Sequence, residues 1–160
     1  MSDGVLERSY YELIFHLKGV LEGCNDAVAG MASAAALLKD RLDHVFWVGF
    51  YLAQPDGTLQ VGPYQGPIAC IRLPNGRGVC GEAVRTQRSV LVADVRSYPG
   101  HIECDARSKS EIVVPICIEG RILGVLDVDS DKSNAFTETD RTRLEEIADL
   151  LAPLLARGGA

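Results

Sequence analysis

DVRSYPGHIECDARSKSEIVVPI, residues 94–116, is the stretch around which the predicted fold is built. It opens as a loop rich in turn-forming residues and closes in an apolar run, Ile112–Ile116, that is typical of a buried strand. One cysteine, Cys104, lies in the loop, and Glu111 stands at the start of the strand. A thiol on a polar loop, beside a carboxylate held on a rigid strand, suits chemistry better than it suits core packing. The stretch therefore predicts a reactive site at one end of a sheet.

The strand continues into a hairpin. Ile112–Ile118 and Arg121–Val128 are apolar runs joined by the short turn Glu119-Gly120, which is a hairpin pattern. Pro115 lies inside the first run. Because proline has no backbone N–H to donate to a neighbouring strand, it predicts a sheet edge or a β-bulge at this point.

Helical patterns lie at both ends of the chain. Residues 1–42 are predicted to form two helices. Between Val5 and Leu21 apolar residues recur at steps of three and four, which predicts an amphipathic helix, and Asp26 can cap a second helix over residues 27–42. A further helix is predicted over residues 136–156, where Thr137 and Asp140 resemble a capping box. Pro153 should bend or end that helix.

The predicted sheet and its loops occupy residues 43–130. Val45–Leu52 is β-branched and aromatic and predicts a strand, and Thr58–Val61 returns beside it after a strong turn signal. Residues 62–67 contain two glycines and two prolines and are interpreted as a connection. Ala69–Leu73 is interpreted as a short third strand.

This order of elements predicts an α+β fold. Strands joined by hairpins form an antiparallel sheet, and the N- and C-terminal helices collect on one face of it. The other face is left to long loops, which is a natural place for a small-molecule pocket. The length of 160 residues favours a single domain over residues 1–160.

Composition excludes several classes of function. The net charge is −6, and no basic stripe is present, which argues against nucleic-acid binding. No apolar run approaches the ~20 residues of a membrane span, and the N-terminus lacks a signal-peptide pattern, so we expect a cytoplasmic protein. The five cysteines are an odd number in a reducing compartment, which argues against a structural disulfide framework. No cysteine or histidine pattern has zinc spacing, so no metal site is expected.

Three cysteines lie on turn-rich segments: Cys70, Cys80 and Cys104. Cys80 stands near a predicted helix start, where backbone N–H groups favour a thiolate. Cys117 lies in an apolar run and is predicted to be core. Any of these thiols can equally be a buried small hydrophobic residue, and their spacing alone does not establish that they meet.

Carboxylates and aromatic residues form a second group of candidates. Asp127 and Asp129 are two apart on a strand and share one face, which either points to solvent or lines a pocket beside Glu111. In a pocket, such carboxylates bind an ammonium group, or one of them keeps a proton and acts as an acid. Trp47 and Tyr51 share a face and serve either sheet packing or an aromatic wall around a ligand.

The residues carry a specific resemblance that covers almost the whole chain. The segments concerned are WVGFYL (47–52), VGPYQG (61–66), ACIRLPNGRGVCG (69–81), the 94–116 stretch and GVLDVDS (124–130). Together they resemble the free methionine-(R)-sulfoxide reductases, stand-alone GAF domains that reduce the free amino acid. The ordered set of three cysteines, 10 and then 24 residues apart, is the most specific signal. Tyr98, Glu103 and Pro67-Ile68 depart from the family pattern, and none is a motif residue.

The resemblance implies a role for each candidate residue. It implies that Cys104 is the catalytic thiol, that Cys70 is the principal resolving cysteine, and that Cys80 is an additional one. It also implies that Glu111, Asp127 and Asp129 bind the substrate and handle protons, and that Trp47 and Tyr51 line the methyl-sulfoxide end of the pocket.

The resemblance also implies a chemical course without a bound metal, flavin or nicotinamide. The catalytic thiolate attacks the sulfoxide sulfur, methionine leaves, and the resulting sulfenic acid condenses to an intramolecular disulfide that thioredoxin resets. The main alternative is a small-molecule-binding GAF sensor without catalysis, and a third is a dimerisation module built on the terminal helices. Those helices would also allow the enzyme to form a homodimer.

Overall fold

The computed structural model describes residues 1–158, which form one six-stranded antiparallel sheet and four α-helices. The strand order is β3-β2-β1-β6-β5-β4. The elements are α1 (Asp3–Leu21), α2 (Ala27–Arg41), β1 (Trp47–Ala53), β2 (Leu59–Gln65), β3 (Arg72–Leu73), α3 (Gly78–Thr86), β4 (Val90–Val92), the 3-10 turn η1 (Val95–Ser97), β5 (Ser110–Ile118), β6 (Arg121–Ser130) and α4 (Glu138–Gly158).

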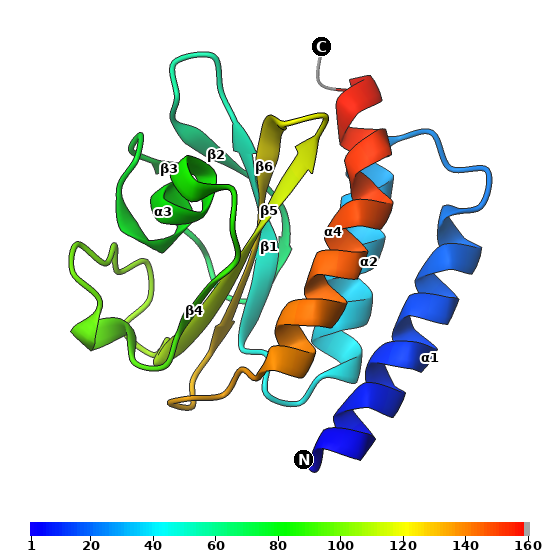
Figure 1. The fold of residues 1–160 in the computed structure, drawn as a ribbon, viewed down its shortest axis with the longest axis horizontal. Helices are drawn as coiled ribbons and strands as arrows, with labels where there is room; N and C mark the ends of the chain where they lie inside the picture. The colour runs from blue at the N-terminus through cyan, green and yellow to red at the C-terminus, as the bar shows by residue number, and fades with distance from the viewer. Residues whose placement is uncertain (159–160) are drawn as a thin grey trace.

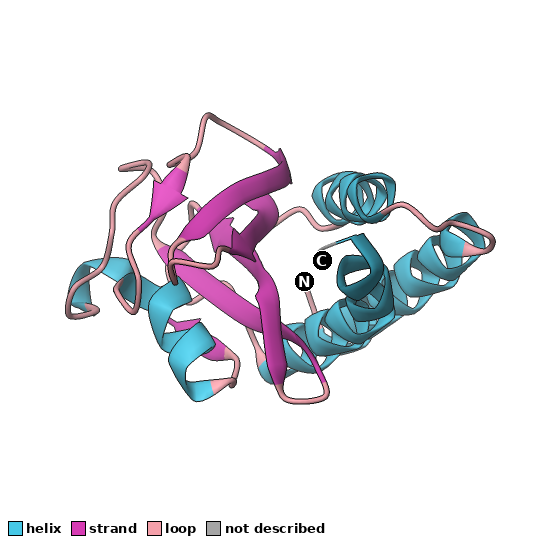
Figure 2. Cartoon of the chain, turned by 90° about the horizontal axis from the view of Figure 1, so that it is seen from above, coloured by secondary structure: helices cyan, strands magenta, loops and turns pink. Residues whose placement is uncertain are grey.

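The sheet separates two layers of different character. Helices α1, α2 and α4 lie side by side on one face, and α3 with the loop around η1 lies on the other (Figures 1 and 2). The first and the last described helices, α1 and α4, are both in the helical layer (Figure 1). The predicted α+β class, with the terminal helices on one face of an antiparallel sheet and loops on the other, is confirmed.

Side-chain alternation in the strands produces two separate cores. Even-numbered residues of β1, such as Val48 and Phe50, belong to the apolar core under the helices. Odd-numbered residues, such as Trp47 and Tyr51, belong to a second cluster under α3 and the loops. The same alternation in β6 directs Leu126 to the helices. The second face is therefore free to carry polar groups.

A buried carboxylate ties the helical layer to the sheet. Asp140, in the first turn of α4, accepts a hydrogen bond from the Tyr10 hydroxyl of α1 at 2.7 Å and contacts His44 Nε2 at 2.9 Å. Its second oxygen accepts from the backbone N–H of Thr137 at 2.8 Å, which is the carboxylate half of the predicted capping box. The prediction that Pro153 bends or ends this helix is wrong in its second alternative, because α4 continues to Gly158.

Two predicted strand boundaries in residues 58–73 are wrong. The segment interpreted as a connection belongs to β2, which continues to Gln65 because Gln65 pairs with Val48. The glycine and proline signals mark a bulge instead, at which Gly62 and Pro63 together face one residue of β1. The third strand is only Arg72–Leu73, so that Ala69–Ile71 forms a loop.

Two further expectations concern β5. Strand β4 pairs only with Glu111–Val113, so Pro115 lies where β5 has no second neighbour in the described chain. The ladder to β6 then shifts register between Ile116 and Cys117, which confirms the predicted irregularity close to the proline. The prediction that Cys117 is core is wrong, because its side chain is only half-buried beyond this shift. Within residues 1–158, no helix combines the length and the apolar character needed to cross a membrane.

Candidate active site

Pairing between non-consecutive strands brings the predicted acids beside the predicted aromatic wall. Asp129 of β6 pairs with Trp47 of β1 on one side and with Glu111 of β5 on the other. Asp127 follows two residues before Asp129 and therefore points to the same face, opposite Gly49. Three adjacent strands thus align an indole and three carboxyl groups on the face that the helices leave uncovered.

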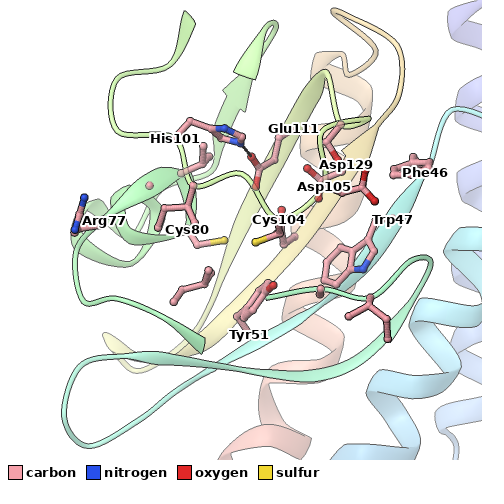
Figure 3. A pocket seen from close by; sticks show the side chains of 18 residues that line it. Phe46, Trp47, Tyr51, Arg77, Cys80, His101, Cys104, Asp105, Glu111 and Asp129 are labelled. Atoms are coloured by element: carbon pink, nitrogen blue, oxygen red, sulfur yellow. Dashed lines mark ion pairs between the residues drawn. The ribbon is translucent and has the colours of Figure 1, made fainter. Parts of the chain in front are cut away.

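These side chains line a pocket between the sheet, α3 and the loop around residue 104 (Figure 3). Seven of the eight predicted site residues line it: Trp47, Tyr51, Cys80, Cys104, Glu111, Asp127 and Asp129. The eighth, Cys70, lies in the loop before β3 and is joined to the pocket through Cys104. The structure therefore brings together the residues that the family resemblance named, and Cys70 lies in a loop and not in the predicted strand.

Cys70 and Cys104 form a disulfide. Their Cα atoms are 5.4 Å apart, and the two residues are 34 positions apart in the chain. Cys104 is exposed and Cys70 half-buried, so an external thiol can approach the bond. Cys80 is a free thiol on the other side of the pocket, in the first turn of α3. In Figure 3 the sulfur atoms of Cys80 and Cys104 both point into the cavity.

The three carboxyl groups are crowded and buried. Burial raises the pKa of Glu111, Asp127 and Asp129. The charge of Asp127 raises the pKa of the other two further, whereas hydrogen bonds from Glu111 and Cys80 partly offset the rise at Asp127 itself. Burial and mutual repulsion thus disfavour the simultaneous ionisation of all three groups, which favours a cluster that keeps a proton and can give it to a bound molecule.

The aromatic wall is built by stacking. The Trp47 ring stacks on Tyr51 with centroids 6.0 Å apart and on Tyr64 of β2 with centroids 5.3 Å apart. Gly49 makes this possible, because a Cβ at that position would lie 2.3 Å from the Cβ of Tyr64. Trp47 Nε1 donates to the carbonyl of Pro67 at 3.1 Å, so the wall also holds the loop that carries Cys70.

Comparison with known proteins decides the family. The family model for the GAF domain matches residues 20–156. GAF domain-containing protein A of Dictyostelium discoideum is 47% identical over 151 residues, covering 94% of this chain and 95% of that protein. Free methionine-R-sulfoxide reductase of Escherichia coli (strain K12) is 43% identical over 147 residues, covering 92% of this chain and 88% of that protein.

A solved structure agrees with the sequence matches. The X-ray structure of free methionine-R-sulfoxide reductase from Neisseria meningitidis, in complex with its substrate, has a TM-score of 0.92 and 42% identity. The match covers 98% of this chain and 93% of that chain. The chain belongs to the free methionine-R-sulfoxide reductases of the GAF family. It is accordingly an oxidoreductase.

In this reductase the predicted thiolate at Cys80 is wrong. Although Cys80 lies in the first turn of α3, burial raises the pKa of its thiol, and the charges of Asp127 and Glu111 raise it further. Burial and the charges of the acids on the sheet face thus outweigh the effect of the helix N-terminus, which by itself would favour a thiolate. The Cys80 side chain in this pocket is therefore a neutral thiol and not a thiolate.

Sequence reasoning missed several residues of the reductase pocket. His101 Nε2 lies 3.7 Å from Glu111 Oε2 (Figure 3), and burial lowers the pKa of the imidazole. Phe46 lines the pocket beneath the guanidinium of Arg107, which lies 5.0 Å from the ring centroid. The position of His101 in the loop beside Cys104 was the available signal for it. Phe46 precedes β1, and the sequence gave no signal that it lines the pocket.

Proposed function

We propose that residues 1–160 are a single catalytic domain that reduces free L-methionine-(R)-S-oxide to methionine. The observation that carries the proposal is the disulfide between Cys70 and Cys104 at the mouth of an acid-lined pocket. This is the oxidised state that a thiol reductase reaches after one turnover. The names of the related reductases give the class of substrate.

The chemistry begins at Cys104. In the reduced protein its thiolate attacks the sulfoxide sulfur, and the sulfoxide oxygen takes one proton. The resulting hydroxyl group then passes to the Cys104 sulfur as its bond to the substrate sulfur breaks. The cluster of Glu111, Asp127 and Asp129 supplies a proton, which the raised pKa values of these carboxyl groups support. Methionine leaves, and Cys104 carries the oxygen as a sulfenic acid.

Recycling then uses Cys70. Its thiol condenses with the sulfenic acid of Cys104, forming the disulfide and releasing water. A dithiol of the thioredoxin type reduces this disulfide by exchange and itself becomes oxidised. The balance is one sulfoxide and one dithiol consumed for one methionine, one water and one partner disulfide. A cytoplasmic location, where such dithiols are kept reduced, suits this cycle.

Substrate recognition follows from the two walls of the pocket. Carboxylates at Asp127 and Asp129 bind the α-ammonium group, and the stacked rings of Trp47 and Tyr51 contact the methyl-sulfoxide end. The loops on the uncovered sheet face partly enclose the pocket, which supports selection of a free amino acid over a peptide. Cys80 serves as a second thiol that can exchange with the disulfide.

Activity assays with two variants test the proposal. Cys104→Ser should abolish methionine production from free methionine-R-sulfoxide with thioredoxin as reductant. Cys70→Ser should give one methionine per chain in a single turnover and then stall, because the sulfenic acid has lost its main partner. Multiple turnovers in Cys104→Ser would contradict the mechanism, and substrate binding without any methionine from the wild-type protein would favour the sensor function instead.

A homodimer is part of the same proposal. Helix α1 exposes Tyr11 and Phe15 to 72% and 74%, one turn apart on the side away from the sheet. Burying this pair against a second copy would remove apolar surface from water. A wild-type chain that sediments as a monomer at micromolar concentration would contradict the dimer.

A further inference from the structure

The loop that carries Cys70 lies outside the sheet. The ladder of β2 with β1 ends at Gln65, and the chain pairs with a strand again only at Arg72. Residues 66–70 are exposed or half-buried, and within residues 1–158 they share no backbone-to-backbone hydrogen bond with any other segment. Side chains must therefore hold this loop if Cys70 is to keep its position.

Two side chains of β1 hold the loop. The Tyr51 hydroxyl donates a hydrogen bond to the carbonyl of Cys70 at 3.0 Å, and the Trp47 indole N–H donates to the carbonyl of Pro67 at 3.1 Å. Both donors lie on the same face of one strand. The loop is thus attached near its start and again at Cys70 itself.

Tyr51 is a rigid support for this contact. It is buried, and its backbone lies in the sheet between Val61 of β2 and Val125 of β6. Burial raises the pKa of the Tyr51 phenol well above its ordinary value of 10.0, and the charge of Asp127 raises it further, so the hydroxyl keeps its hydrogen at neutral pH. A phenol has a single hydrogen to donate, and the Cys70 carbonyl takes it.

The position of the Cys70 backbone decides whether the disulfide can form. The Cα atom of Cys70 lies 5.4 Å from that of Cys104. Two cysteines can be bridged only up to a Cα separation of about 7 Å, so a loop that moves away by about 2 Å loses the bond. The Tyr51 hydrogen bond holds the carbonyl group attached to the Cys70 Cα and limits such movement. Without it, joining the two thiols would cost more conformational entropy.

We propose that the Tyr51 hydroxyl is a positioning group for Cys70, and that it favours the Cys70–Cys104 disulfide by holding the Cys70 carbonyl. Tyr51 then supports the recycling half of the reaction as well as the aromatic wall. This role deepens the proposed function, on which it rests for the assignment of Cys70 as the resolving thiol. The sequence gave no signal for it, because 19 residues separate the two partners.

A redox equilibrium tests the role without any substrate. In glutathione buffers, the reduced pair and one oxidised glutathione give the protein disulfide and two reduced glutathione molecules. Alkylation of the remaining thiols and peptide mass spectrometry then measure the disulfide fraction of the Cys70–Cys104 pair separately from the three free cysteines. We expect Tyr51→Phe, which removes only the hydroxyl group, to lower the equilibrium constant by about two- to tenfold, the usual contribution of one hydrogen bond.

The matched control is Tyr64→Phe. Tyr64 also stacks on Trp47, so this change removes a hydroxyl from the same stack but not the one that reaches Cys70. The equilibrium constant should stay at the wild-type value in this variant. Because Cys70 is half-buried, water can reach the carbonyl that Tyr51→Phe leaves free, and that variant should fold.

A second measurement follows the same step during turnover. In Tyr51→Phe the Cys104 sulfenic acid should persist about two- to tenfold longer, measured as the fraction trapped by dimedone per methionine formed. If no methionine forms, the proposed function fails and the glutathione equilibrium still decides the role of Tyr51. An equilibrium constant in Tyr51→Phe equal to that of the wild-type protein would overturn the positioning role. Equal losses in both variants would also overturn it, because the stack and not the hydrogen bond would then support Cys70.

Discussion

At the scale of single residues, the surroundings of Cys70 indicate how the disulfide meets its reductant. Ile68 and Ile71 are 82% and 71% exposed, although isoleucine is normally buried. They bracket Cys70, half of the bond that the reductant must attack. Exposed apolar side chains beside an accessible disulfide suit the docking of a protein dithiol. A small thiol can reduce the disulfide without contacting them.

Ile71→Ser should therefore weaken recycling by thioredoxin selectively. Removing an isoleucine contact costs about 1.5 kcal/mol, which corresponds to about a tenfold higher KM for thioredoxin. The rate with dithiothreitol should be unchanged. Steady-state kinetics with each reductant measure this, and Val28→Ser, which removes an exposed apolar side chain from α2, is the control. Equal losses with both reductants would show that Ile71 supports the pocket and not docking.

Asp140 is the residue whose charge stabilises the helical layer. Burial would raise its pKa, but hydrogen bonds from His44, Tyr10 and Thr137 outweigh burial and lower it below the ordinary value of 3.8. A carboxylate with a lowered pKa contributes stability above its unfolded pKa and loses that contribution as the pH falls through its folded pKa.

Asp140→Asn should lower the free energy of unfolding by about 2 to 4 kcal/mol at neutral pH. The difference from the wild-type protein should shrink as the pH falls below 3.8, because Asp140 is then protonated as well. Urea unfolding across this pH range measures both effects. Asp149→Asn, an exposed change on the same helix, should have little effect at any pH. A difference that stays constant with pH would mean that the charge of Asp140 is irrelevant.

At the scale of elements, β1 depends on a glycine between its two site aromatics. Gly49→Ala would place a Cβ 2.3 Å from the Cβ of Tyr64 and 2.7 Å from the Trp47 ring. We expect a loss of about 1 to 3 kcal/mol in unfolding free energy and a higher KM for the sulfoxide, because the stacked wall must separate. Gly19→Ala on α1 meets no atom within 4 Å and should instead stabilise the protein by about 0.5 to 1 kcal/mol. A stable Gly49→Ala variant with unchanged KM would contradict the role of the stack.

Elements with strong local signals were predictable from the sequence. The terminal helices and the β5–β6 hairpin carry clear periodicity, and the structure has them with boundaries shifted by a few residues. The errors lie in residues 58–73, where glycine and proline indicate turns in most contexts. There the pairing of Gln65 with Val48 keeps the chain in the sheet through a bulge, which depends on contacts distant in sequence.

The candidate site was predictable in its residues but not in its electrostatics. Alternation along β6 placed Asp127 and Asp129 on one face, and Asp129 indeed lies between Trp47 and Glu111. The state of Cys80 was mispredicted because a helix terminus is visible in sequence, whereas acids packed against it from other strands are not. Burial of that kind is known only once the fold is.

At the scale of the whole molecule, the disulfide changes the stability of the fold. It closes a loop of 34 residues that contains α3, β4 and η1. Constraining such a loop in the unfolded chain contributes up to about 4 kcal/mol. The oxidised protein should therefore unfold at higher urea concentration than the reduced protein, as followed by circular dichroism with and without dithiothreitol. Cys70→Ser should not respond to the reductant, and equal midpoints for both wild-type forms would contradict the expectation.

The alternation of side chains along β6 also limits how this lineage can change in length. One residue inserted in the strand before Leu126 would turn both aspartates into the apolar layer under the helices and bring Leu126 to the pocket, which would destroy core and site together. Insertions and deletions should therefore be excluded from β6. They should accumulate in segments such as residues 22–26, between α1 and α2, where a change in the number of residues moves no side chain of the pocket.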